Sequence, residues 1–285
     1  MASTARISPD DIAASLAELP PLPASISEVI AACDDNDVTV GHLSQIILRD
    51  QNLTANILKL ANSAFYGHSR RVTTITEAVV LLGFSAIKSL AISSHTSRIL
   101  RRAVPSYGLA TGDLWRHSIA AAFCARRLAV EVQLAPVEQA FVAGLLHDIG
   151  KLVLASHMED VFEEMSAEAR TRHVPFHLIE AEVLGFDHAE LGARVAAQWA
   201  FPAELEEAIR FHHDPDQATV KPRLAHVVHL ADVVCMTFGV GLGIDGLAYE
   251  ANPATLDALG FDQQRLLTLV DELGPMFESD AFSLD

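Results

Sequence analysis

The chain has 285 residues, half of them hydrophobic, and a formal net charge of −17. This length suits one large domain or two closely packed ones, and the hydrophobic share allows a sizeable core. The acidic balance argues against general binding to nucleic acids or anionic membranes, because both carry negative charge.

The sequence offers no pattern typical of a membrane protein or a secreted one. No apolar run reaches the roughly 18–20 residues that a membrane span needs, and the first residues, Met-Ala-Ser-Thr-Ala-Arg, lack the apolar core of a signal peptide. The cysteines Cys33, Cys124 and Cys235 are far apart and in apolar surroundings. Buried free thiols in a reducing compartment explain them best, so we expect a cytoplasmic protein.

Residues 1–105 carry balanced charge and show the patterns of successive short helices. A cap residue followed by proline, Ser8-Pro9, begins the first. A capping box at 74–77 begins another, which stops at Gly83. Helices are expected over 8–18, 24–33, 40–48, 51–63, 74–83 and 84–102. We interpret 1–105 as an N-terminal helical lobe.

Residues 106–285 hold 11 basic and 28 acidic residues, so the whole net charge lies in this half. Hydrophobic periodicity predicts helices over 112–131, 136–148, 150–170, 175–184, 187–200, 203–212, 222–238, 253–259 and 262–273. Segments of β-branched residues, such as 38–40 and 72–75, are too short to build a sheet. The predicted fold class is all-α, with a second, metal-binding helical lobe over 106–275 and a C-terminal tail over 276–285.

Histidines and aspartates recur at the ends or on the apolar faces of helices in the second lobe. A carboxylate or imidazole among aliphatic residues is costly unless it is hydrogen-bonded or metal-bound. One arrangement uses them all: a first metal held by His117, His147, Asp148 and Asp232, and a second held by His188, His212 and His213, with Asp148 as the bridge. Neutral imidazoles with few carboxylates suit two ions of zinc, iron or manganese better than magnesium or calcium.

A simpler interpretation exists for each histidine taken alone, since most histidines are hydrogen-bonded core or surface residues. The ordered set, with every member at a helix end or on an apolar face, is much harder to obtain by chance. The sequence therefore favours a metal site. A paired site could activate water for attack on phosphorus.

Neighbouring charged residues are secondary candidates. Lys151 could contact a substrate phosphate as a point charge and, with Asp148, is our candidate for a catalytic role. Asp113 shares a helix face with His117, so it could ligate or orient the site, or it could be a solvated cap. Arg116 is a weaker phosphate candidate. We place His226 and His229 outside the ligand set.

The order of these residues resembles the HD-domain metal-dependent phosphohydrolase superfamily, whose ligands are a His, an adjacent His-Asp and a distal Asp. The additional His188, His212 and His213 are similar to the two-metal branch that includes the HD-GYP cyclic dinucleotide phosphodiesterases. The Gly-Tyr-Pro motif of that branch is missing after His213, where the chain reads Asp-Pro-Asp-Gln-Ala. Because that loop helps to shape the substrate pocket, its absence puts the substrate in doubt.

From about residue 12 to 275 the chain resembles the HDOD family, the HD-related output domain, and the most specific motifs lie in its N-terminal half. The segments that carry the resemblance are Leu-Pro-Pro-Leu-Pro at 19–23, Ile-Leu-Arg-Asp at 47–50 with Leu53-Thr54, Leu-Ala-Asn-Ser at 60–63 and Ala-Val-Val-Leu-Leu-Gly at 78–83. HDOD domains are bacterial signalling modules, many of which lack the metal ligands. This chain departs from those by keeping the full ligand order.

Two functions follow from these features. The first is a signal-transduction module whose metal site is structural or senses a ligand, with a signalling protein or a small phosphorylated, nucleotide-like molecule as partner. The second is an active metal-dependent phosphohydrolase acting on a nucleotide or cyclic dinucleotide. The intact ligands favour the second, and the missing motif and the HDOD-like lobe favour the first, which we prefer.

Overall fold

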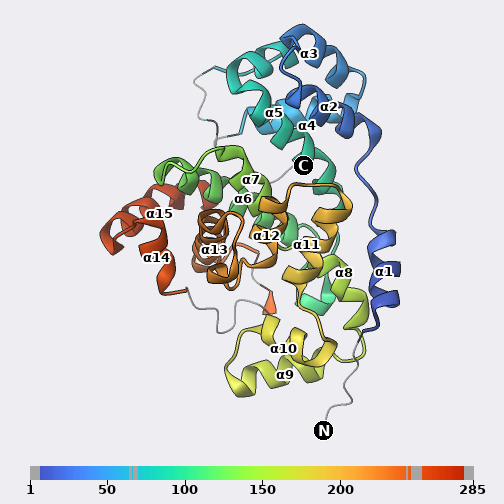
Figure 1. Cartoon of the computed structure of the whole chain (residues 1–285), viewed down its shortest axis with the longest axis vertical. Coiled ribbons are helices and arrows are strands. Elements are labelled where there is room, and N and C mark those ends of the chain that lie inside the picture. Colours follow the sequence, from blue (N-terminus) through green and yellow to red (C-terminus); the bar gives the residue numbers. More distant parts are fainter. Residues whose placement is uncertain (1–6, 64–65, 67–69, 242, 245–251, 279–285) are drawn as a thin grey trace. The chain divides into compact units, whose positions relative to one another are not determined.

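The computed structural model describes residues 7–63, 66, 70–241, 243–244 and 252–278, and within these ranges the chain is helical with no strand (Figure 1). The all-α prediction is confirmed. The chain divides into two compact units: one holds the chain up to Pro20 together with Leu100–Leu273, and the other holds Pro21–Ile99 and the chain from Gly274 onward. The lobe limits at 105 and 275 stay a prediction, and residues 279–285 of the predicted tail lie outside the described ranges.

The unit of Pro21–Ile99 is built from α2 (Ala24–Asp34), α3 (Val40–Leu48), α4 (Gln51–Ala61) and most of α5 (Ile75–Leu100). Side-chain caps begin two of these helices, because Thr39 accepts the N–H of His42 and Asp50 accepts the N–H of Leu53. Aliphatic residues of all four helices form one buried cluster. Gly83 has φ 80° and ψ 166°, so it interrupts α5 where the sequence predicted a helix end.

Among the described helices, α5 is long and apolar enough to cross a membrane by length and composition alone. Half of its most apolar stretch is buried inside the protein. A core helix of a soluble protein meets the same test, so α5 is weak support for a membrane span and is consistent with a soluble protein.

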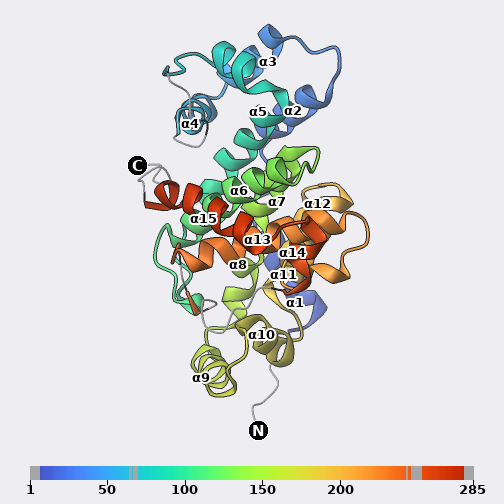
Figure 2. The ribbon, with the colours of Figure 1, turned by 90° about the vertical axis from the view of Figure 1, so that its left-hand side faces the viewer.

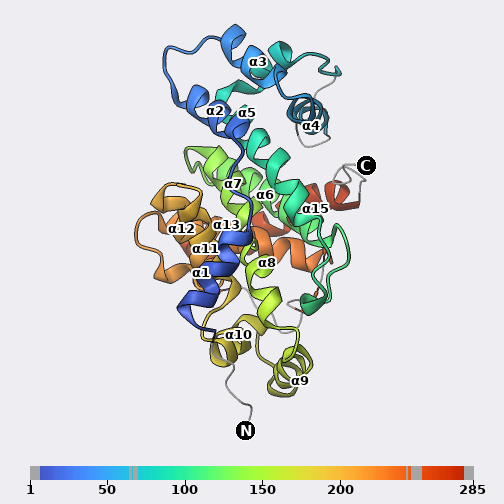
Figure 3. The ribbon, with the colours of Figure 1, turned by 90° about the vertical axis from the view of Figure 1, so that its right-hand side faces the viewer.

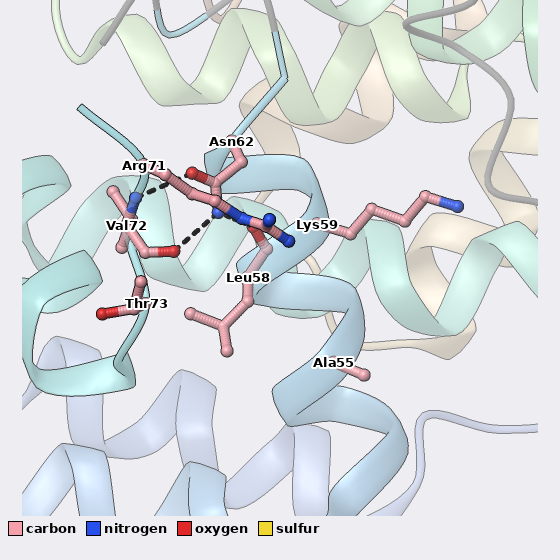
Figure 4. Close-up of a pocket in the computed structure, with 7 residues that line it drawn as sticks. All are labelled: Ala55, Leu58, Lys59, Asn62, Arg71, Val72 and Thr73. Atoms are coloured by element: carbon pink, nitrogen blue, oxygen red, sulfur yellow. Dashed lines mark hydrogen bonds between the residues drawn. The ribbon is translucent and has the colours of Figure 1, made fainter. Parts of the chain in front are cut away.

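A surface groove of about 990 Å³ lies beside the end of α4 (Figure 4). Asn62, the residue that ends α4, holds its wall in place: its amide group donates to the carbonyl of Val72 and accepts the N–H of Val72, both over 2.8 Å. The groove is lined by Ala55, Leu58, Lys59, Asn62, Arg71, Val72 and Thr73. Asn62 therefore has a structural role here, joining the helix end to the extended segment that precedes α5.

The larger unit contains the remaining helices, the last of them only as far as Leu273 (Figures 1–3). They are α1 (Pro9–Glu18), α6 (Asp113–Glu131), α7 (Val137–Leu146), α8 (Gly150–Leu154), α9 (Phe162–Arg172), α10 (Phe176–Leu184), α11 (His188–Gln198), α12 (Ala203–Arg210), α13 (Pro222–Thr237), α14 (Ala254–Leu259) and α15 (Gln263–Glu278), with short 3-10 turns at Pro105–Tyr107, Ala155–His157 and Pro215–Gln217. α6 packs against α7 and α13, and α11 packs against α8 and α12. α9 and α10 lie side by side in Figures 1 and 3.

Two glycines let backbones approach closely around the histidine-rich region. A Cβ on Gly150, the first residue of α8, would lie 1.9 Å from the carbonyl oxygen of His188 and 2.5 Å from the nitrogen of Gly192. Gly241, at φ +61°, sits against α6, where a Cβ would lie 2.8 Å from that of His117. Both contacts exclude any larger residue without a shift of the backbone.

The predicted helix over 150–170 differs from the structure, which contains α8, a 3-10 turn and α9 in its place. At the break the Ala155 carbonyl accepts the N–H of Met158 over 3.2 Å, a bond of the 3-10 type, and also the hydroxyl of Ser106 over 3.1 Å, while Ser15 contacts His157 over 2.8 Å. Hydrophobic periodicity alone contains no information about such distant partners.

Candidate metal centre

Five segments of the larger unit bring the seven predicted ligands together. His117 lies on α6, His147 and Asp148 lie in the turn between α7 and α8, and His188 is the first residue of α11. His212 and His213 follow α12, and Asp232 lies on α13. Three overlapping groups have all their ligand atoms within 4.8 Å of one another: His117, His147 and Asp148; His147, His212 and Asp232; His188, His212 and His213.

The outer ring nitrogens of the histidines are fixed by hydrogen bonds to acceptors. Nδ1 of His117 donates to the Val240 carbonyl over 3.0 Å, and Nδ1 of His147 donates to the Gly144 carbonyl over 2.7 Å. His212 repeats this pattern with the Ile209 carbonyl at 2.7 Å. A carbonyl can only accept, so each Nδ1 carries a proton, and in its neutral form each ring presents an Nε2 lone pair to the interior.

These Nε2 atoms converge on one another and on the two carboxylates. Nε2 of His117 lies 3.3 Å from Nε2 of His147 and 3.0 Å from Oδ1 of Asp232. Nε2 of His188 lies 2.9 Å from Nε2 of His213 and 3.4 Å from Oδ1 of Asp148. Because Nδ1 of His117 and of His147 already carries a proton, Nε2 of either ring can donate only when the ring holds a second, added proton. Burial lowers the pKa of His147, but the charges of Asp148 and Asp232 outweigh burial and raise that pKa above its usual value. Stable convergence of this kind calls for a cation between the rings, a metal ion or added protons.

The surroundings of His212 favour a metal ion over added protons. Its ring is completely buried, and Nε2 has no hydrogen-bond partner among the described residues. A buried acceptor without a partner is costly and rare in folded proteins. The donor set of imidazoles and carboxylates fits zinc, iron or manganese, and Nε2 of His212 is a ligand atom that such an ion would bind.

The charges of the cluster also fit a divalent cation. Burial by itself would raise the pKa of Asp148, but His147 and Lys151 hold that pKa well below its usual value. Burial opposes ionisation of Asp232 as well, and hydrogen bonds from His117 and His147 nevertheless lower its pKa strongly. Both carboxylates are therefore ionised at neutral pH.

The two histidines after α12 stay neutral. Burial, together with the surrounding imidazoles, lowers the pKa of His212 and that of His213 well below the usual value for histidine. Neutral imidazole is the form that ligates a metal, so no proton has to leave these two rings when an ion binds.

Lys151 lies inside the cluster and is buried. Its Nζ donates to Oδ2 of Asp148 over 2.7 Å and lies 5.6 Å from the centre of the Tyr107 ring. The lysine thus contacts the very carboxylate that was predicted to bridge two ions. Whether it also meets a phosphate, as the sequence predicted, remains a prediction.

Three residues that the sequence interpretation did not include also belong to this region. The Glu180 carboxylate on α10 accepts the Nδ1–H of His188 over 2.8 Å, and Tyr107 contributes a hydrogen bond to the same carboxylate. His177, also on α10, stacks on His213 with ring centres 3.9 Å apart. A signal for Glu180 existed, because Phe176, Glu180 and Leu184 share one helix face at a spacing of four, which places a carboxylate in an apolar stripe.

The other secondary candidates, Asp113 and Arg116, do not belong to the three groups of ligand atoms. Asp113 is half-buried, and its Oδ2 accepts the N–H of Ala110 over 2.8 Å at the start of α6. Arg116 is exposed. His229 donates from Nδ1 to the His212 carbonyl over 2.7 Å and accepts the N–H of Asn252 at Nε2, so both its nitrogens hold backbone in place.

An all-helical protein with histidines and aspartates clustered in this order belongs to the class that the HD-type domains define. Comparison of the sequence with protein families matches the HDOD domain over residues 19–215, and the chain belongs to the HDOD family. The predicted resemblance is therefore confirmed.

Solved structures with similar folds cover nearly the whole chain. A candidate phosphohydrolase from Shewanella amazonensis SB2B is 28% identical, with a TM-score of 0.73 over 95% of this chain and 96% of that chain. A candidate signal transduction protein from Marinobacter aquaeolei VT8 is 26% identical, with a TM-score of 0.73 over 96% of this chain and 63% of that chain.

Among curated relatives, an uncharacterized protein of Treponema pallidum (strain Nichols) is 28% identical over 281 residues, which are 94% of this chain and 52% of the relative. The chain thus spans about half the length of that relative. Activities that depend on the whole relative do not transfer from this match.

Proposed function

We propose that this HDOD protein is a signal-transduction module that holds two divalent transition-metal ions in its larger unit, the ions being iron, manganese or zinc. The observation that carries the proposal is the convergence of imidazole Nε2 atoms and two ionised carboxylates, with Nε2 of His212 left without a hydrogen-bond partner among the described residues. In the proposed assignment His117, His147, Asp148 and Asp232 hold one ion. His188, His212 and His213 hold the other, and Asp148 bridges the two.

Burial of the ligands supports a regulatory or ligand-sensing role over catalysis. Six of the seven are 2% exposed or less, and only His213 is half-buried. Structural metal sites are closed by their ligands, whereas catalytic sites keep a position open for water or substrate. The similar Marinobacter protein, a candidate in signal transduction, supports the same role, with a signalling protein or a nucleotide-like molecule as partner. A cytoplasmic location remains part of this proposal.

A second candidate function is phosphoester hydrolysis, which the placement of Lys151 and the likeness to a candidate phosphohydrolase favour. Two ions would act as Lewis acids on a phosphate ester. Lys151, with its ammonium group on Asp148, would add a positive charge beside that ester. In this case Lys151→Ala should reduce turnover of cyclic dinucleotides at least tenfold while metal content stays the same; loss of both together would make Lys151 structural.

Metal content tests the proposal directly. Protein purified without chelators or an affinity tag should contain close to two ions per chain by mass spectrometry. His147→Ala and Asp148→Ala should lower that number and the melting temperature, because an ion that binds only the folded state stabilises it. Lack of metal in the wild type, even after reconstitution with iron, manganese or zinc, would contradict the proposal. Unchanged metal content in Asp148→Ala protein would contradict the bridging assignment.

A further inference from the structure

Glu180 is a completely buried carboxylate that reaches the cluster from outside the ligand set. It is 0% exposed, and its Oε2 accepts two hydrogen bonds from one residue: the backbone N–H of His188 over 2.8 Å and the ring Nδ1–H of His188, also over 2.8 Å. These two bonds hold both the backbone and the ring of His188 by a single oxygen atom.

The geometry fixes the tautomer and the direction of the His188 ring. Because Nδ1–H points at Glu180, the lone pair of Nε2 points the opposite way, toward Oδ1 of Asp148 at 3.4 Å and Nε2 of His213 at 2.9 Å. His117, His147 and His212 are held by main-chain carbonyls, which are neutral. Among these four rings, His188 is the one whose outer nitrogen meets a carboxylate.

A charged acceptor makes the ring a stronger electron donor than a carbonyl does. We propose that Glu180 is a positioning residue for the second ion: it orients His188 and strengthens it as a ligand. Binding of the second ion therefore depends on α10 more than binding of the first ion does. This inference rests on the proposed dinuclear site, since it names the residue that governs one half of it.

The same helix offers a matched control. Glu182 lies two residues further along α10 and is exposed, and it pairs with Arg172 on α9. Glu180→Gln keeps the shape of the side chain and an oxygen that can accept both hydrogen bonds, but it removes the charge. Glu182→Gln makes the identical chemical change on the opposite, solvent-facing side of the helix.

The experiment titrates metal-free wild type, Glu180→Gln, Glu180→Asp and Glu182→Gln with zinc against a chelating indicator, which resolves two dissociation constants. We expect Glu180→Gln to weaken the affinity for one ion by roughly 10–100-fold, the range seen for groups that orient metal ligands, and to change the other by less than threefold. Glu182→Gln should match wild type. Glu180→Asp restores the charge and should recover part of the loss.

The outcomes separate this inference from the proposed function. Wild type that binds no zinc contradicts the dinuclear site itself. Wild type that binds two ions, with Glu180→Gln within threefold of Glu182→Gln at both, contradicts the role of Glu180 alone. Equal weakening of both ions, or a Glu180→Gln chain that loses its helical circular dichroism when metal-free, makes Glu180 a general structural residue and also overturns the inference.

Discussion

Lys151 contacts the carboxylate of Asp148, and a bound divalent ion would contact the same group. Either cation offsets the buried negative charge. The ammonium group of Lys151 compensates the buried charge of Asp148 through a 2.7 Å hydrogen bond. Breaking one side of a buried ion pair costs about 3 kcal/mol or more when nothing replaces the lost charge. In the metal-loaded protein the ion replaces it.

Lys151→Met should therefore lower the melting temperature of chelator-treated protein by several degrees and that of metal-loaded protein by much less. Differential scanning fluorimetry with and without chelator measures both. The variant should also bind metal more tightly, because a competing cation has been removed. Equal losses of melting temperature in both states would show that Lys151 supports the fold independently of Asp148.

At the scale of single residues, the sequence predicted which histidines and aspartates lie together, but not their surroundings. His117, His147, Asp148, His188, His212, His213 and Asp232 were all found by their order and by the apolar character of their neighbours. The acceptors of the Nδ1 protons were not predictable, since three are main-chain carbonyls that any residue type could provide. Glu180 could have been predicted from the sequence, because its side chain is the one carboxylate on the buried face of α10.

At the scale of elements, the close approach of α8 to α11 depends on Gly150. A Cβ there would meet the His188 carbonyl oxygen at 1.9 Å, so Gly150→Ala must push α11 away from α8. Gly41, in the first turn of α3, has no atom within 4 Å of its Cβ position. The two glycines therefore make a matched pair for the same substitution.

Gly150→Ala should destabilise the protein by about 3 kcal/mol or more and displace His188, with loss of metal. Gly41→Ala should instead stabilise it by up to about 1 kcal/mol, since alanine restricts the unfolded chain. Urea unfolding monitored by circular dichroism compares them. A Gly150→Ala protein as stable as the wild type would mean that the two helices can separate without penalty.

Helix positions were predictable wherever the signal is local. Thr39, Asp50 and Asp187 each accept a backbone N–H at a helix start, and the helices that follow begin within a residue of the prediction. The predicted helix over 150–170 was wrong: the α-helix gives way to a 3-10 turn at Ala155, whose carbonyl also accepts the hydroxyl of Ser106, about fifty residues away in the sequence. Local sequence patterns indicate the helix propensity of a segment. They contain no information about contacts from distant parts of the chain, which also influence where a helix ends.

At the scale of the whole molecule, the seven predicted ligands and Glu180 all belong to the larger unit, which also carries most of the negative charge. The smaller unit contributes no residue to the cluster within the described ranges. An acidic unit lowers the free energy of a bound cation even at a distance. We therefore expect metal affinity to depend on the larger unit and on the packing of its helices around the cluster.

The near-complete burial of the ligands has a kinetic consequence. An enclosed ion can leave only when the surrounding helices open, and such openings are rarer than ordinary side-chain motion. Removal of metal should follow a rate that does not change when the chelator concentration is raised tenfold, measured by the absorbance of the chelate. A rate proportional to chelator concentration would mean that solvent reaches the ions directly. If exchange is slow in this way, the ion that the protein carries is selected once, while the chain folds, and later changes in the supply of metal leave it in place.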